Sequence, residues 1–275
     1  MASDRQGFFA TLFARHELLS TLVGRNLTIR YKGSALGFLW SLLTPLFFIL
    51  IYAAFATILK FNRGQPHYLQ FLVGGIIVWQ FTASCLNDSL FSIIGNANLV
   101  KKVAFPRVIL PASTAIADAI NFLLTFLVLL LYLLLTGAAD FHHAWWVLPA
   151  FLMQLVLGIG LCCLCGTLNV FFRDVQHIVG VVTQAWFFLS PAFYDVSMQL
   201  ELLRDRFHWP EWLAYLNPIT GILGCYRLGV MGAPGLVPAP WSPLYPALSA
   251  AVCLVVFLLG LAVLRAGDRR FGDIL

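Results

Sequence analysis

The sequence predicts an all-helical integral membrane protein, and three observations support this fold class. Hydrophobic residues make up 60% of the 275 residues and charged residues 11%, whereas soluble domains average about 45–50% and about 25%. Six apolar segments are long enough to cross a bilayer, which takes about 20 residues. The cations between these segments are divided unequally between the two sides. A chain with so few polar residues cannot cover a soluble core, so we expect its surface to face lipid.

Residues 8–30 are expected to form a basic amphipathic helix that lies in the cytoplasmic membrane interface. Apolar side chains recur there at spacings of three and four, and these are Phe9, Leu12, Phe13, Leu19, Val23 and Leu27. Arg15, Glu17 and Arg25 occupy the rest of the circumference, which makes the segment too polar to span. The same charges interrupt every apolar run, so no cleavable signal peptide is expected.

The stretch RYKGSALGFLWSLLTP, residues 30–45, is expected to join this helix to the first span through an elbow. Its cations can sit at the level of the lipid headgroups, and Gly33-Ser34 lets the chain turn. The predicted elbow residues are Arg25, Arg30, Tyr31 and Lys32.

The predicted spans are 35–59, 69–94, 109–136, 145–171, 176–194 and 244–264. Of the 17 cations, twelve fall on the side of the N-terminus and five on the other side. The positive-inside rule therefore places both termini in the cytoplasm.

Two segments outside the spans have unusual composition. NANLVKKVAFPR, residues 96–107, is short and basic, and it fits either a solvated loop or a docking helix for a soluble partner. Residues 209–232 are too apolar for a loop in water, and Asn217-Pro218 divides them. The thirteen residues of 219–231 rise about 1.5 Å each and cannot cross a core of about 30 Å. We expect two re-entrant or interfacial half-helices there.

Motifs for catalysis and cofactor binding are absent from the sequence. It contains no phosphate-binding G-x-x-x-x-G-K-[ST] loop, no H-E-x-x-H and no G-x-S-x-G. The adjacent His142 and His143 face different ways on a helix, and the six cysteines lie in apolar segments, so no metal site is expected. We therefore expect neither enzymatic activity nor a cofactor in this chain.

Asp88 and Asp118 are acids within the second and third predicted spans, where ionisable groups are functional candidates. Asn121 follows Asp118 on the same helix face, so a structural hydrogen-bond pair between spans is one interpretation. A proton relay is the other, but it would need a chain of such groups.

The ordered set of motifs resembles the membrane-spanning subunits of ABC-2-type exporters for bacterial polysaccharides such as O-antigen, capsule and teichoic acid. The markers are RNLTIRYKGSALGFLWSLLTPL at 25–46, NANLVKKVAFPRVILP at 96–111, FFRDVQHIV at 171–179, LNPITGI at 216–222 followed by Arg227, and RRFGDIL at 269–275. They extend over nearly the whole chain.

The resemblance implies a homodimer in the cytoplasmic (inner) membrane that pairs with two copies of a nucleotide-binding subunit. ATP and Mg would be bound by that subunit, and a lipid-linked polysaccharide, O-antigen in the first instance, would pass between the protomers. The implied contacts with the ATPase subunit are Asn98, Leu99, Val100, Lys101, Lys102, Phe105, Pro106 and Arg107.

Aromatic side chains suit a polysaccharide channel because they stack on the C–H faces of sugars and allow sliding. The candidates are Trp40, Tyr52, Trp79, Trp186, Phe187, Phe188 and Tyr194. Alternatively, such residues at span ends anchor the protein at the interface. The competing functions are a drug or antibiotic exporter of the ABC-2 type, a membrane-embedded transferase acting on lipid-linked sugars, and a secondary transporter.

Overall fold

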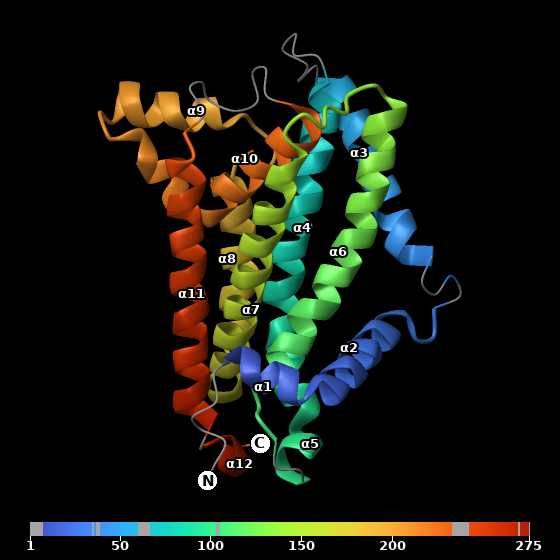
Figure 1. Cartoon of the computed structure of the whole chain (residues 1–275), viewed down its shortest axis with the longest axis vertical. Helices are drawn as coiled ribbons and strands as arrows, with labels where there is room; N and C mark the ends of the chain where they lie inside the picture. The colour runs from blue at the N-terminus through green and yellow to red at the C-terminus, as the bar shows by residue number, and fades with distance from the viewer. Residues whose placement is uncertain are drawn as a thin grey trace.

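The computed structural model describes residues 8–34, 36, 39–59, 67–102, 105–232, 242–268 and 270–274. Long helices stand side by side in a bundle, with short helices at both ends (Figure 1). The long helices are α3 (Trp40–Leu59), α4 (Tyr68–Ser92), α6 (Ile109–Leu135), α7 (Val147–Phe171), α8 (Val175–Leu189) and α11 (Leu244–Asp268). The described residues therefore confirm an all-helical fold.

Shorter elements gather at the two ends of the bundle. At one end lie α1 (Phe8–Ala14), α2 (His16–Tyr31), η2 (Ile94–Asn96), α5 (Ala97–Lys102) and α12 (Phe271–Ile274). At the opposite end lie η3 (Ala144–Trp146), α9 (Val196–Glu201), the π-helical turn η4 (Leu202–Arg206), η5 (Glu211–Leu216) and α10 (Pro218–Met231).

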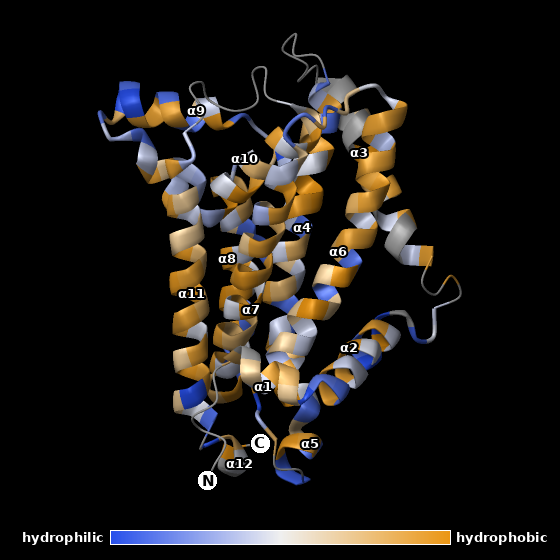
Figure 2. Ribbon diagram, in the orientation of Figure 1, coloured by the Kyte–Doolittle hydropathy of each residue, from blue (hydrophilic) through white to orange (hydrophobic). Residues whose placement is uncertain are grey.

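Four helical segments among the described residues are long and apolar enough to cross a membrane. They are Tyr68–Ser92, Ile109–Leu135, Ala144–Phe171 and Leu244–Asp268. Apolar residues cover the middle of the bundle, and hydrophilic residues collect at its ends (Figure 2). This distribution matches the predicted spans over 69–94, 109–136, 145–171 and 244–264.

The other two predicted spans differ more from the structure. α3 has 20 residues, which corresponds to about 30 Å and begins at Trp40 rather than at 35. α8 has 15 residues, or about 22 Å, and ends at Leu189 rather than at 194. The prediction of helix over 190–194 was wrong, because Pro191 disfavours helical geometry at Ser190, whose backbone is extended.

The bundle is held together by close helix approach and by buried amide hydrogen bonds. Gly160 on α7 meets α11 so closely that an added Cβ would lie 2.6 Å from the Cα of Phe257. The Gln154 amide donates to the Val78 carbonyl at 2.9 Å, and the Asn169 amide donates to the Leu90 carbonyl at 2.6 Å. Small residues and interhelical hydrogen bonds drive helix association in membranes, so α7 is the centre of the packing.

The predicted interface helix over 8–30 is broken at Arg15 into α1 and α2. Val23 is buried where α2 packs against α6, but Phe13 of the predicted apolar stripe is 79% exposed. The stripe therefore serves partly for packing onto the bundle, and it is not continuous.

Residues 209–232 contain the predicted division into two pieces. Asn217 caps α10, because its side-chain oxygen accepts a hydrogen bond from the Ile219 N–H at 3.2 Å and Pro218 occupies the first helical position. α10 packs among α4, α7 and α11. Buried Arg227 donates from Nη2 to the Ala192 carbonyl at 3.0 Å and lies 3.5 Å from the centre of the Phe71 ring.

A loop contact fixes the C-terminal end of α10. The Asp140 N–H donates to the Val230 carbonyl at 2.9 Å. The backbone N–H of His142 donates to Asp140 Oδ1 at 3.0 Å, and the His142 ring lies 2.6 Å from the same oxygen. These hydrogen bonds lower the pKa of the Asp140 carboxyl.

Candidate functional site

Two helices face each other with polar side chains at helical spacing. Gln80, Ser84 and Asp88 recur every four residues along α4. Thr114, Asp118, Asn121 and Thr125 recur at spacings of four, three and four along α6. We call these seven residues the polar seam. Polar groups are rare within membrane spans and mark cavities or pathways.

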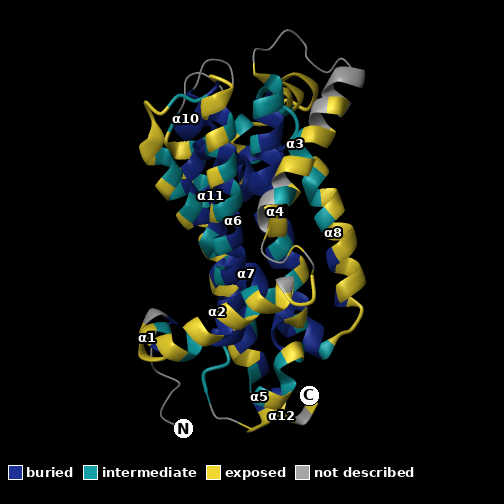
Figure 3. Ribbon diagram, turned by 90° about the vertical axis from the view of Figure 1, so that its right-hand side faces the viewer, coloured by how far each residue is buried: buried dark blue, intermediate teal, exposed yellow. Residues whose placement is uncertain are grey.

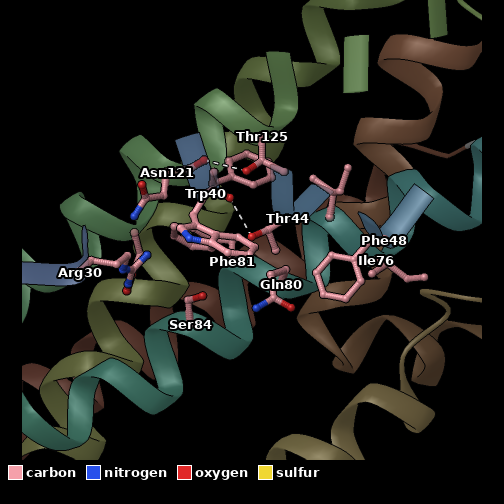
Figure 4. Close-up of a pocket in the computed structure, with 13 residues that line it drawn as sticks. Arg30, Trp40, Thr44, Phe48, Ile76, Gln80, Phe81, Ser84, Asn121 and Thr125 are labelled. Carbon is pink, nitrogen blue, oxygen red and sulfur yellow. Dashed lines mark hydrogen bonds and ion pairs between the residues drawn. The ribbon is translucent and has the colours of Figure 1, made fainter. Parts of the chain in front are cut away.

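α3 adds an aromatic wall and closes a cavity of about 340 Å³ beside the upper part of the seam. Trp40, Thr44 and Phe48, again four residues apart, face Gln80, Phe81 and Asn121 across it (Figure 4). We call this space the seam cavity. Trp40 is 41% exposed, so its ring lines the cavity but is not enclosed by it.

Arg30, at the end of α2, contacts the polar seam on both α4 and α6. Its Nη2 contacts Asp88 on α4 and lies 2.5 Å from Asp118 Oδ1 on α6. The Asp118 side chain is only 1% exposed, whereas the side chains of Arg30 and Asp88 are 31% and 43% exposed. One guanidinium therefore shares its single positive charge between a buried carboxylate and a half-exposed one.

A second cavity of about 450 Å³ continues on the other side of Arg30, between α2, α4 and α6. Arg25 donates to Asn96 Oδ1 at 2.5 Å, and Asn26 donates to Ser113 Oγ at 3.3 Å. These contacts join α2 to η2 and to α6. Together with Arg30, they make α2 a wall of both cavities.

The sequence predicted that the elbow cations lie at the lipid headgroups, but two of them bind side chains of the bundle. Arg25 and Arg30 bind partners on η2, α4 and α6, while Lys32 is exposed. The side chain of Tyr31 lies outside the described residues. The interpretation of Asp118 as a pair with Asn121 missed its cationic partner.

The predicted docking segment, residues 96–107, contains a short helix that projects from the end of the bundle. α5 covers residues 97–102, with Lys101 and Lys102 exposed and Val100 buried. Asn98 is exposed, and Leu99, Phe105 and Pro106 are half-buried.

Arg107 lies where this segment meets the C-terminal end of the chain. Its Nη1 donates to the Asp268 carbonyl and to Asp268 Oδ1, the latter at 3.1 Å. Its guanidinium also lies 5.6 Å from the centre of the buried Phe271 ring. The resemblance implied that Arg107 contacts the ATPase subunit. In the structure, its guanidinium binds Asp268 of the same chain.

Most of the predicted channel aromatics lie together near the C-terminal end of α8. Trp79 is buried, with its ring centre 5.8 Å from Trp186 and 5.7 Å from Phe187. Trp186 donates its indole N–H to Asn217 Oδ1 at 2.9 Å. Phe188 is 62% exposed.

Tyr194 and Tyr52 are two further candidates for the channel. The Tyr194 hydroxyl accepts a hydrogen bond from Gln199 at 2.5 Å. The side chain of Tyr52 lies outside the described residues. The structure therefore places Trp40 on the seam cavity and packs Trp79 against its neighbours.

A family model described as ABC-2 type transporter matches residues 17–231. The chain belongs to the ABC-2 type transporter family. It is 31% identical over 261 residues to the O-antigen export system permease protein RfbA of Klebsiella pneumoniae, which covers 94% of this chain and 95% of that protein. It is also 32% identical over 212 residues to a second K. pneumoniae protein of that name, with coverage of 77% and 79%. A Myxococcus xanthus protein of that name is 31% identical over 217 residues, with coverage of 78% and 81%.

Membership of the ABC-2 family agrees with the resemblance seen in the sequence. With its apolar helices, the chain is a multi-pass membrane protein and the permease subunit of a transporter. A permease subunit is not itself catalytic. Among the described residues, no group of three metal-binding side chains comes together.

Proposed function

We propose that this ABC-2 permease exports a lipid-linked cell-surface polysaccharide, with O-antigen as the first candidate, across the cytoplasmic membrane. The similarity to export permeases over 94% of the chain carries the proposal. The aromatic and polar lining of the seam cavity supports it, because a glycan needs both C–H stacking surfaces and hydrogen-bonding groups.

The proposal includes six spans, with α3 and α8 as the first and fifth, and a homodimer with the channel between protomers. The unpaired apolar surface of α8 supports this arrangement (Figure 3). Ile178, Val181 and Phe188 are 59%, 71% and 62% exposed along it. In this arrangement α10 and η5 are re-entrant elements at the outer surface.

The proposed ATPase contact is the projecting end of α5. Lys101 and Lys102 offer two exposed cations next to the apolar Leu99, a combination that suits docking into a cleft of a soluble subunit. ATP and Mg belong to that subunit. The first and last described helices, α1 and α12, lie at the same end as α5 (Figure 1), so this arrangement places both of them on the cytoplasmic side.

The assembly can be tested by charge reversal in cells whose own permease gene is deleted. Lys101→Glu with Lys102→Glu should prevent co-purification of the nucleotide-binding subunit and reduce surface polysaccharide per inserted permease molecule. The matched control is Arg206→Glu, an exposed cation at the opposite end of the bundle, and it should leave both quantities unchanged.

Two results would contradict the proposal. Normal export and normal co-purification in the double variant would remove the docking role of α5. A deletion strain with normal surface polysaccharide but altered resistance to drugs would assign the chain to drug export instead.

Orientation can be tested separately with a thiol reagent that does not cross membranes. His142→Cys should be labelled in intact cells, and Lys102→Cys should be labelled only after the membrane is opened. Both positions are exposed, and the six native cysteines are buried. Labelling of Lys102→Cys in intact cells would reverse the proposed topology.

A further inference from the structure

We propose that the seam cavity is a sugar-binding site contained within one protomer, where single pyranose units of the glycan are held between Trp40 and the polar seam. The inference rests on the proposed function. It differs from the channel between protomers because α3, α4 and α6 of one chain supply all of the described residues that line the cavity apart from Arg30 of α2.

The first argument is the presence of polar groups without partners at membrane depth. Gln80 is the central residue of the 25-residue α4, and its side chain is exposed. Within the described part of the chain, neither Gln80 nor Ser84 makes a side-chain hydrogen bond. Asp118 Oδ2 is buried and likewise has no partner among the described residues. A polar group left unpaired in hydrocarbon costs several kcal/mol, so these groups require water or a polar ligand.

The second argument is the match between these groups and a sugar ring. Amides, hydroxyls and carboxylates together offer donors and acceptors, and each sugar hydroxyl can both donate and accept. Gln80 and Ser84 line one side of the cavity, and the Trp40 ring lines another (Figure 4); Asp118 is also a lining residue. A pyranose has hydroxyls around its edge and C–H groups on its faces, so one ring can use both walls.

The third argument is that Trp40 is available to a ligand whereas Trp79 is not. Trp186 and Phe187 pack on Trp79, with ring centres 5.8 and 5.7 Å away, and Trp79 is only 5% exposed. Trp40 approaches Phe47 only at 6.5 Å and remains 41% exposed. The volume of about 340 Å³ lies at the lower end of the range for small-ligand pockets, which suits one or two rings rather than a folded segment of polymer.

A neutral glycan also fits the charges around the cavity better than an ionic ligand does. Arg30 already contacts Asp88 and Asp118. An anion would have to compete with these carboxylates for the guanidinium, and a cation would have to compete with the guanidinium for the carboxylates. A lipid tail would leave Gln80 and Ser84 unpaired.

Thiol protection tests occupancy directly in the permease–ATPase complex in lipid nanodiscs. The probe is lipid-linked polysaccharide extracted from membranes of cells that lack the permease. Ser84→Cys should react with a small water-soluble thiol reagent, because the reactive thiolate forms only where water is present. The probe should slow this reaction at least about threefold. Leu127→Cys, 64% exposed on another face of α6, should stay unreactive with or without the probe.

Each outcome decides the inference. A reactive Ser84→Cys that the probe does not protect would overturn sugar binding and leave a hydrated cavity. An unreactive Ser84→Cys would mean that another helix or lipid fills the cavity, and it would also overturn the inference. If the probe does not stimulate ATP hydrolysis by the wild-type complex, the proposed function itself fails. Stimulation without protection refutes only the sugar site.

A pair of matched substitutions supplies a second measurement. Gln80→Leu and Asn87→Leu each remove one side-chain amide from α4, but Asn87 bonds its own helix at the Ala83 carbonyl and lines neither cavity. One lost hydrogen bond corresponds to about a three- to tenfold effect. Gln80→Leu should therefore raise the probe concentration for half-maximal stimulation by that factor, while Asn87→Leu leaves it unchanged. Equal effects of the two variants would contradict the site.

Discussion

Arg30→Ala should destabilise the folded protein strongly, because it leaves a buried carboxylate without its cation. The Asp118 side chain is 1% exposed, and removing one partner of a buried pair costs about 3–5 kcal/mol. Asp88 binds the same guanidinium but is 43% exposed, so its pair is worth about 1 kcal/mol or less. The Arg30–Asp118 contact should therefore dominate.

Three further variants separate the two contacts. Asp88→Asn should cost about 1 kcal/mol or less. Asp118→Asn should cost less than Arg30→Ala, because Arg30 keeps Asp88 and partial exposure to water. Arg30→Ala combined with Asp118→Asn should recover most of the loss, since the double variant buries no unpaired charge. The assay is the free energy of unfolding of purified protein in mixed micelles, titrated with a denaturing detergent.

Two outcomes of these unfolding measurements would refute the reasoning. If Asp88→Asn destabilises as much as Arg30→Ala, burial does not determine the strength of these pairs. If the double variant is no more stable than Arg30→Ala alone, the cost does not come from the stranded Asp118 carboxylate.

Three other substitutions test separate parts of the structure. Gly160→Ala should destabilise the protein by about 1–3 kcal/mol through overpacking against α11. Gly180→Ala should not, because a Cβ added at Gly180 has no other atom within 4 Å. Equal unfolding free energies of the two variants would contradict the close approach of α7 and α11. Asn217→Ala should cost about 1 kcal/mol or more in the same assay, because it removes the α10 cap and the amide hydrogen bonds to the Leu189 carbonyl and Ser190 Oγ. Asn217→Asp keeps a capping oxygen but loses the amide donors, so it should lose less stability than Asn217→Ala; equal losses would argue against capping. Trp40→Phe should retain most export per inserted molecule and Trp40→Ala should lose much of it, measured as surface polysaccharide; wild-type export by the Ala variant would leave Trp40 as an interface anchor.

The four long apolar helices could be predicted because hydropathy alone identifies segments of more than 20 apolar residues. The break at Asn217-Pro218 was also predictable, since an Asn cap followed by Pro is a local signal. Pro191 likewise indicates that α8 ends early, but residues 190–194 are mostly apolar and were therefore included in the predicted span. Hydropathy does not distinguish an apolar turn from a helix.

The site was less predictable because its parts are distant in the chain. Arg30 lies 58 and 88 residues from the two acids that it binds, and no local pattern reports such a pairing. The polar seam, in contrast, was present in the sequence as a helical repeat: Gln80 and Ser84 precede Asp88 at four-residue intervals, and Thr125 follows Asn121. Considering Asp88 and Asp118 as isolated acids missed that repeat.

The contact between Arg107 and the last turns of the chain has a consequence for biogenesis. Asp268 lies 161 residues after Arg107, so Asp268 and Phe271 are synthesised only after helices α3 to α10 have been made. Domains assemble from the N-terminus during synthesis, so α5 is made early but gains its contacts with α12 late. If α5 docks a soluble subunit as proposed, a chain that still lacks α11 and α12 would present an incompletely supported docking helix, and docking before those helices are made would be disfavoured.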